Sequence, residues 1–126
     1  MRNIGLLNTK NFTRALLICS TMSLLSCSDN PTVEMVKNGS LESCESKTLG
    51  EMVEGFMGSP SWSSGVTQEN QEFVDVDGTI MFADKEVEAS LQFLVNSETF
   101  EYNALEFNGV PQNNFVAMGL LNKMCE

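Results

Sequence analysis

The feature that most constrains the fold of this chain is an alternation of apolar and polar side chains over residues 73–95. Successive side chains of a β-strand point to opposite faces, so such a pattern predicts strands that are apolar on one face and polar on the other. Two strands are predicted, and the Asp84-Lys85 turn between them makes them antiparallel. Gly78 interrupts the first strand and is predicted to mark a bulge or a bend. The apolar positions are Val74, Val76, Ile80 and Phe82, followed by Val87, Ala89, Leu91, Phe93 and Val95.

A third strand is predicted after the Asn96-Ser97-Glu98 turn, and a shorter strand before the first two, over residues 62–66. In the third strand the apolar positions change parity between Ala104 and Leu105. A change of parity requires an extra residue, so we expect a bulge near Ala104. Long strands joined by short turns indicate an antiparallel meander with one polar face.

Two helices are predicted, one before these strands in the sequence and one after them. Thr48 and Glu51 have the spacing of a capping box, and an apolar stripe at Leu49, Met52, Val53 and Phe56 follows. The last helix is expected after the Asn108-Gly109 turn, with Pro111 in its first turn. The predicted fold class is therefore α+β: an antiparallel β-meander of 3–4 strands with two helices packed on one face, in the order α-β-β-β-β-α.

The first 26 residues have the features of an export signal. Residues 1–14 carry three basic residues and no acidic one, and a mostly apolar run of 12 residues follows at 15–26. That run is too short to cross a bilayer as a helix, which takes roughly 20 residues. A basic start followed by a short apolar run is typical of a signal peptide.

Leu24-Leu25-Ser26-Cys27 resembles the lipobox of bacterial lipoproteins. The resemblance implies cleavage between Ser26 and Cys27 and attachment of a lipid, with fatty acids such as palmitate, to Cys27. Such a lipid would anchor the protein to a membrane. Because Ser28, and not Asp, follows the cysteine, the resemblance favours the outer membrane, facing the periplasm. The alternative is an ordinary cleaved signal peptide with an incidental cysteine.

This interpretation divides the chain into three parts. Residues 1–26 form the lipoprotein signal peptide, 27–43 the lipidated cysteine and a tether, and 44–126 the small α+β domain. The tether is expected because residues 28–39 show no clear period and end in the turn signal Asn38-Gly39.

The mature chain is strongly acidic. Removing residues 1–26 takes away three of the seven basic residues and leaves four against all 17 acidic ones, a net charge of about −13. Nucleic-acid binding needs basic residues to neutralise the phosphates, so we expect that this chain does not bind nucleic acid. A solvated surface explains this acidity, and a basic partner is the functional alternative.

Cys44 and Cys125 are the thiols that remain in the predicted exported domain. An oxidising compartment favours a structural disulfide between them. Unpaired thiols remain an alternative. A redox role is disfavoured because the chain has neither a Cys-x-x-Cys motif nor a histidine that would lower a thiol pKa.

The absence of histidine also limits catalysis. It excludes Ser-His-Asp and Cys-His mechanisms, histidine-bound zinc and histidine-held haem. Catalysis by a pair of carboxylates remains possible without histidine. The acidic residues of the strands, however, alternate outward as on an ordinary solvated face, so we expect no enzyme, catalytic residue, metal or cofactor. Asp75-Val-Asp77-Gly78 resembles the start of a calcium loop, yet Ile80 stands where such a loop needs glycine.

Residues 37–126 resemble a module of about 90 residues found at the C-terminal end of uncharacterised bacterial proteins. The similar positions are turns, caps and core residues, so the resemblance implies a fold and no chemistry. Gly58-Ser-Pro60 is also similar to small lipoproteins of outer-membrane assembly, in which a helix ends in Gly-x-Pro before a strand. The segments that carry the first resemblance are Lys37-Asn-Gly39, Thr48-Leu-Gly50-Glu51, Ser59-Pro-Ser-Trp62, Leu91-Gln-Phe93 and Asn108-Gly-Val-Pro-Gln-Asn113.

The sequence therefore predicts a membrane-anchored envelope lipoprotein that acts as a non-catalytic interaction module for an envelope protein partner. Docking is expected through a sheet edge or through Trp62, which is either an exposed interaction anchor or a cover for the open end of the core. Two alternatives stay open: an inhibitor or protective lipoprotein with an acidic binding surface, and a carrier that holds a small ligand between helices and sheet.

Overall fold

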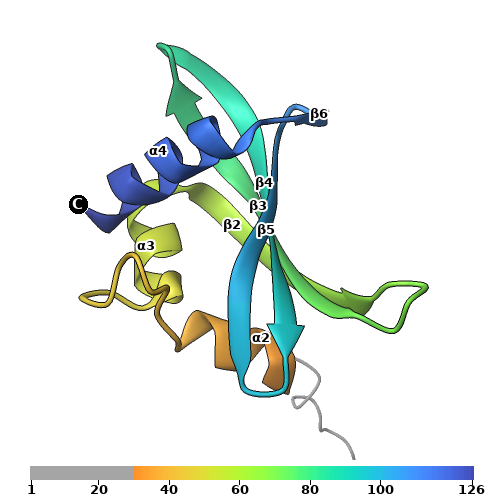
Figure 1. Cartoon of the computed structure of the whole chain (residues 1–126). Coiled ribbons are helices and arrows are strands. Elements are labelled where there is room, and N and C mark those ends of the chain that lie inside the picture. Colours follow the sequence, from red (N-terminus) through yellow and green to blue (C-terminus); the bar gives the residue numbers. More distant parts are fainter. Residues whose placement is uncertain (1–29) are drawn as a thin grey trace, which may run out of the picture. The chain divides into compact units, whose positions relative to one another are not determined.

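The computed structural model describes residues 30–126, and its compact unit is Pro31–Glu126 (Figure 1). This unit is a mixed α/β fold with a five-stranded antiparallel open sheet and, within the described residues, three helices. The elements in chain order are α2 (Pro31–Lys37), α3 (Leu49–Phe56), β2 (Gly58–Val66), β3 (Glu72–Phe82), β4 (Lys85–Asn96), β5 (Thr99–Phe107), β6 (Val110–Pro111) and α4 (Asn114–Cys125).

The sheet is the meander that the alternation predicts. Its strand order is β2-β3-β4-β5-β6, so each strand pairs with its neighbour in sequence. In the β3–β4 pair, Val76 lies opposite Leu91 and Asp75 lies opposite Gln92. Opposed residues point to the same face, so one face collects the apolar residues and the other the polar ones. The sheet has one strand more than the upper limit predicted, because Val110 and Pro111 form the short β6.

The bulge predicted near Ala104 is confirmed. Gln92 pairs with Ala104 and the next residue, Phe93, pairs with Tyr102, which leaves Asn103 as the extra residue of β5. This places Leu105 and Phe107 back on the buried face, where both side chains join the core.

Gly78 marks a bulge of its partner strand and not of its own. The β3–β4 register runs through Gly78 without a shift, whereas β2 shifts between Gly58 and Ser61, directly opposite Gly78. A Cβ atom on Gly78 would lie 3.0 Å from the carbonyl oxygen of Gly58. The missing side chain therefore lets the bulged strand approach closely.

The core lies between the helices and the apolar face of the sheet. Val74 and Val76 of β3 and Leu91 and Phe93 of β4 are fully buried and pack with residues from all three helices in one cluster. Burying a side chain of this size contributes about 1.5–3 kcal/mol. The helix residues in the cluster are Val33 and Val36 of α2, Leu49, Met52 and Val53 of α3, and Ala117, Leu120, Leu121 and Met124 of α4.

The tether predicted for residues 27–43 is wrong from residue 31 onward. Residues 31–37 form α2, and its Val33 and Val36 are buried in the core. The folded unit thus begins at Pro31 and not at residue 44, and it has three helices where two were predicted. A seven-residue helix is too short to be stable alone, so it forms only because the core receives its two valines.

The start of the last helix also differs from the prediction. Pro111 belongs to β6 and pairs with Glu106, while Asn113 caps α4 by accepting a hydrogen bond from the Val116 amide over 2.9 Å. None of the helices within residues 30–126 is long and apolar enough to cross a membrane.

Candidate functional site

Strand β5 has an open side next to the core. It pairs with β4 along its length, but β6 covers it only at Glu106 and Phe107, and the Gln112 amide donates a hydrogen bond to the Leu105 carbonyl. Within the described part of the chain, no strand pairs with the outer side of residues 99–104. Edge backbone groups of this kind can pair with another strand.

Two adjoining hollows, each of about 520 Å³, lie along this open side. Both are lined by Thr99 and Phe100 of β5 and by Glu42 of the loop between α2 and α3. We call the two hollows together the edge groove. Its other lining residues include Leu41, Tyr102, Met118 and Leu121 in the first hollow and Met35, Gly39 and Glu98 in the second.

The floor of the edge groove is aromatic and only partly covered. Phe100 and Tyr102 lie opposite Val95 and Phe93, so both side chains point to the core face of the sheet. Phe100 packs edge-to-face on Phe93, with 6.1 Å between the ring centroids. Both side chains are only partly buried because β5 is the last long strand of the sheet and, within residues 30–126, no further strand shields them. Burial raises the pKa of the Tyr102 hydroxyl above its ordinary value.

The rim of the edge groove is acidic. Glu42 lines both hollows, Glu98 lines the second and Glu101 the first, and all three side chains are exposed. Among the described residues that line the two hollows, none is basic. The groove therefore presents an apolar floor, an open strand edge and a negative border.

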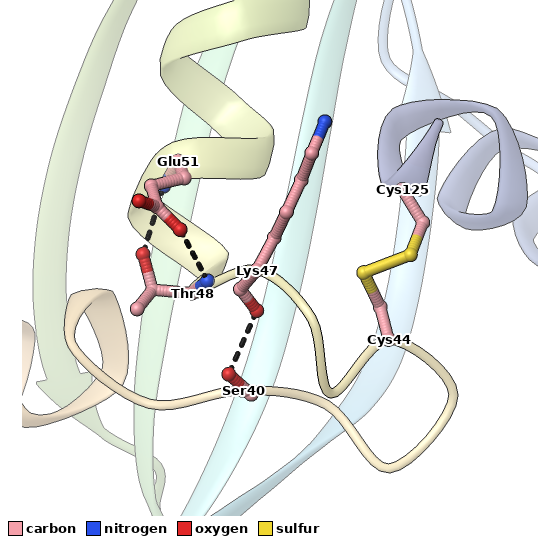
Figure 2. The surroundings of a disulfide bond; sticks show 6 residues. All are labelled: Ser40, Cys44, Lys47, Thr48, Glu51 and Cys125. Carbon is pink, nitrogen blue, oxygen red and sulfur yellow. Dashed lines mark hydrogen bonds between the residues drawn. A yellow bond between two sulfur atoms is a disulfide. The ribbon is translucent and has the colours of Figure 1, made fainter.

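The loop that forms the second side of the groove is held at several points (Figure 2). A disulfide joins Cys44 to Cys125 at the end of α4, as the sequence predicts. The Ser40 hydroxyl donates to the Lys47 carbonyl over 2.7 Å, and the Leu49 amide donates to the Gly39 carbonyl over 2.7 Å. Thr48 and Glu51 then complete the predicted capping box of α3. These bonds fix the loop to α3 and α4.

Gly39 sets the distance between this loop and the groove floor. A Cβ atom at this position would lie 2.6 Å from Cε1 of Phe100 and 3.3 Å from the Met35 carbonyl oxygen. Only the absence of a side chain allows the loop to pass so close to the ring.

A second apolar surface lies on the other side of α4. Phe115 is 88% exposed and Met81 is 65% exposed, and together with Phe56 and Phe82 they line a hollow of about 420 Å³. Phe82 is fixed by Phe107, with ring centroids 4.7 Å apart. We call this surface the Phe115 surface. Exposed apolar patches of this type are common at interaction sites.

The polar face of the sheet carries a partly buried carboxylate, Asp75. Its pKa is raised mainly by desolvation and further by the charges of Asp77 and Glu106, against the effect of a hydrogen bond with Gln92. One of its oxygens is buried and has no hydrogen-bond partner among the described residues, next to a small hollow of about 160 Å³. Among the described residues, no three acidic, histidine or cysteine side chains are grouped so that they could hold a metal ion.

Trp62 packs against the core beside α2. It lies opposite Val76 and is partly buried, with the Lys37 ammonium 5.6 Å from the ring centroid. Its Nε1 is buried, and no group in the described part of the chain forms a hydrogen bond with it. This position favours the covering role that the sequence left open over the role of an exposed anchor.

The remaining predicted site residues, Ser26 and Cys27, lie outside the described residues. The edge groove itself was not predicted residue by residue. The signal that could have indicated it is the pair Phe100 and Tyr102. These two aromatic side chains face the core from the strand at the end of the predicted meander, where they lie at the sheet edge.

No family model, curated protein or solved structure matches this chain.

Proposed function

We propose that this chain is a bacterial envelope lipoprotein, anchored through Cys27, that acts as a non-catalytic interaction module for another envelope protein. The outer membrane, facing the periplasm, is the proposed location. The observation that supports the interaction role is the edge groove. It combines an open strand edge with partly buried aromatic side chains, and it is bordered by a loop that a disulfide fixes to α4. Such a groove offers both backbone hydrogen bonds and apolar area to a partner.

Cross-linking in living cells tests the interaction role. The protein would carry a C-terminal tag, and mass spectrometry would identify what is recovered with it. One envelope protein in near-equal amount is the expected result, and recovery of nothing above background would contradict the proposal.

The lipid anchor has a separate test. Replacing Cys27 by serine removes the thiol that would carry the lipid, so incorporation of labelled palmitate should be lost. Label that persists in the Cys27→Ser variant would contradict the anchor.

A second candidate function is an inhibitor or protective lipoprotein that binds a basic target through the acidic face of the sheet. It is favoured by the grouping of Asp75, Asp77 and Glu106 on this face; desolvation is the main cause of the raised pKa of Asp75, and the charges of the other two carboxylates add to it. Binding through this face should collapse at high salt, because exposed charges are screened within about 8 Å at physiological ionic strength. Target binding that survives high salt would argue against this function. The small-ligand carrier has no specific observation in its favour.

A further inference from the structure

We infer that the edge groove binds an extended, basic segment of a partner protein, which adds to β5 as a further strand of the sheet. This inference rests on the proposed interaction role and specifies the surface and the chemistry of the partner. It follows from three properties of the groove: the backbone of residues 99–104, the aromatic floor, and the acidic rim.

The open edge determines the conformation of the bound segment. Residues 99–104 are held straight by their pairing with β4, except at the bulge at Asn103. A strand rises about 3.3 Å per residue, so these six residues offer an edge of about 20 Å. A segment that satisfies this edge must itself be extended, because only an extended chain presents its amide and carbonyl groups at the spacing of a strand.

The floor determines which side chains the segment carries. Alternate residues of an added strand point to the core face, on the same side as Phe100 and Tyr102. There they enter the first hollow, which is lined by Leu41, Met118 and Leu121, and the second, which is lined by Met35 and Gly39. Apolar side chains at every second position fill these hollows and cover the exposed parts of the two rings.

The rim determines the charge of the segment. Glu42, Glu98 and Glu101 border the groove, and its lining within residues 30–126 contains no basic side chain. Lysine or arginine side chains of the segment would meet these carboxylates, whereas an acidic segment would be repelled. The same argument disfavours a second copy of this chain as the occupant, because pairing two β5 edges would bring two acidic rims close together.

Site-specific photocross-linking in cells tests the inference. A photoreactive amino acid replaces Thr99 in the edge groove or, in a matched chain, Phe115 on the other apolar surface. Mass spectrometry then identifies the partner segment joined to each position. We expect the Thr99 position to join a segment of the partner that is extended, basic and apolar at alternate residues, with a yield well above that of the Phe115 position.

Charge reversal supplies the second measurement. The triple variant Glu42→Lys, Glu98→Lys and Glu101→Lys should lower the cross-link yield at Thr99 by about tenfold or more, because it replaces attraction with repulsion. The control variant Glu54→Lys, Glu69→Lys and Glu86→Lys changes the net charge equally, at exposed positions that line neither hollow, and should keep the yield. Circular dichroism establishes that both variants are folded.

The outcomes separate this inference from the proposed function. If the tagged chain recovers a partner that joins the Phe115 position alone, or an acidic segment at Thr99, the inference is overturned and the interaction role stands. Equal yields for the groove variant and its control would also overturn the inference. If neither the tagged chain nor either position recovers a partner, both proposals fail.

Discussion

At the scale of single residues, Asp75 is a carboxylate whose environment opposes its charge. Desolvation is the main cause of its raised pKa, and Asp77 and Glu106 add to it. In the unfolded chain its pKa returns to its ordinary value of 3.8. The folded state therefore binds this proton more tightly, so the contribution of Asp75 to stability is greatest below pH 3.8 and is lost as the pH rises through the raised pKa.

The variant Asp75→Asn should accordingly be more stable than the natural protein at neutral pH. The gain should be less than about 1 kcal/mol because Asp75 is partly screened by solvent. It should vanish below the ordinary pKa, where the carboxyl is neutral in both states. Urea unfolding followed by circular dichroism across this pH range measures the difference. Glu45→Gln, on the exposed loop before α3, controls for the general loss of one negative charge. A gain that does not depend on pH would contradict the argument.

Gly39 is a second residue whose surroundings decide its identity. Gly39→Ala places a methyl group within 2.6 Å of the Phe100 ring, so either the ring or the loop must move. We expect a loss of about 1–3 kcal/mol in the free energy of unfolding, which is typical of overpacking. Gly55→Ala is the matched control, because nothing lies within 4 Å of its added Cβ and alanine is the better helix former. A loss at Gly39 no larger than that of the control would show that the ring moves without cost.

At the scale of elements, α3 depends on its first turn. The Thr48 hydroxyl accepts from the Glu51 amide over 3.1 Å, and the Glu51 carboxylate accepts from the Thr48 amide over 2.9 Å. Thr48→Ala removes one of these bonds and should lower the free energy of unfolding by about 1 kcal/mol. Thr48→Ser keeps the hydroxyl and should retain most of the stability. Thermal and urea unfolding of the two variants measure the difference, and an equal loss in both would show that the methyl group of Thr48 matters and its hydroxyl does not.

At the scale of the whole molecule, the disulfide joins elements from opposite ends of the folded unit. Cys44 and Cys125 are 81 residues apart, so their bond closes nearly the whole fold into a loop. In the chain-entropy model, opening a loop of this size costs on the order of 4 kcal/mol. The double variant Cys44→Ser and Cys125→Ser should lose about this amount in urea unfolding. A reducing agent should cause a similar loss in the natural protein and none in the variant. If reduction leaves the natural protein unchanged, the bond does not contribute to stability.

The sequence by itself determined the local features of this protein. The alternation of residues 73–95, the parity change at Ala104 and the capping box at Thr48 are readable because strand faces, bulges and helix caps depend on neighbours a few residues away. The pairing of Cys44 with Cys125 could also be predicted, because they are the two cysteines left in the predicted exported domain.

The tertiary structure alone decided the rest. Helix α2 has too few residues to form without the core that buries Val33 and Val36, so no local pattern indicates it. Trp62 packs on the core because β2 pairs with β3 in a register that its own sequence does not specify. The edge groove exists because residues distant in sequence, from the loop at Glu42, strand β5 and helix α4, meet around an edge that no further described strand covers. A surface made by such distant contacts depends on how the elements pack, and packing is not a property of any one segment.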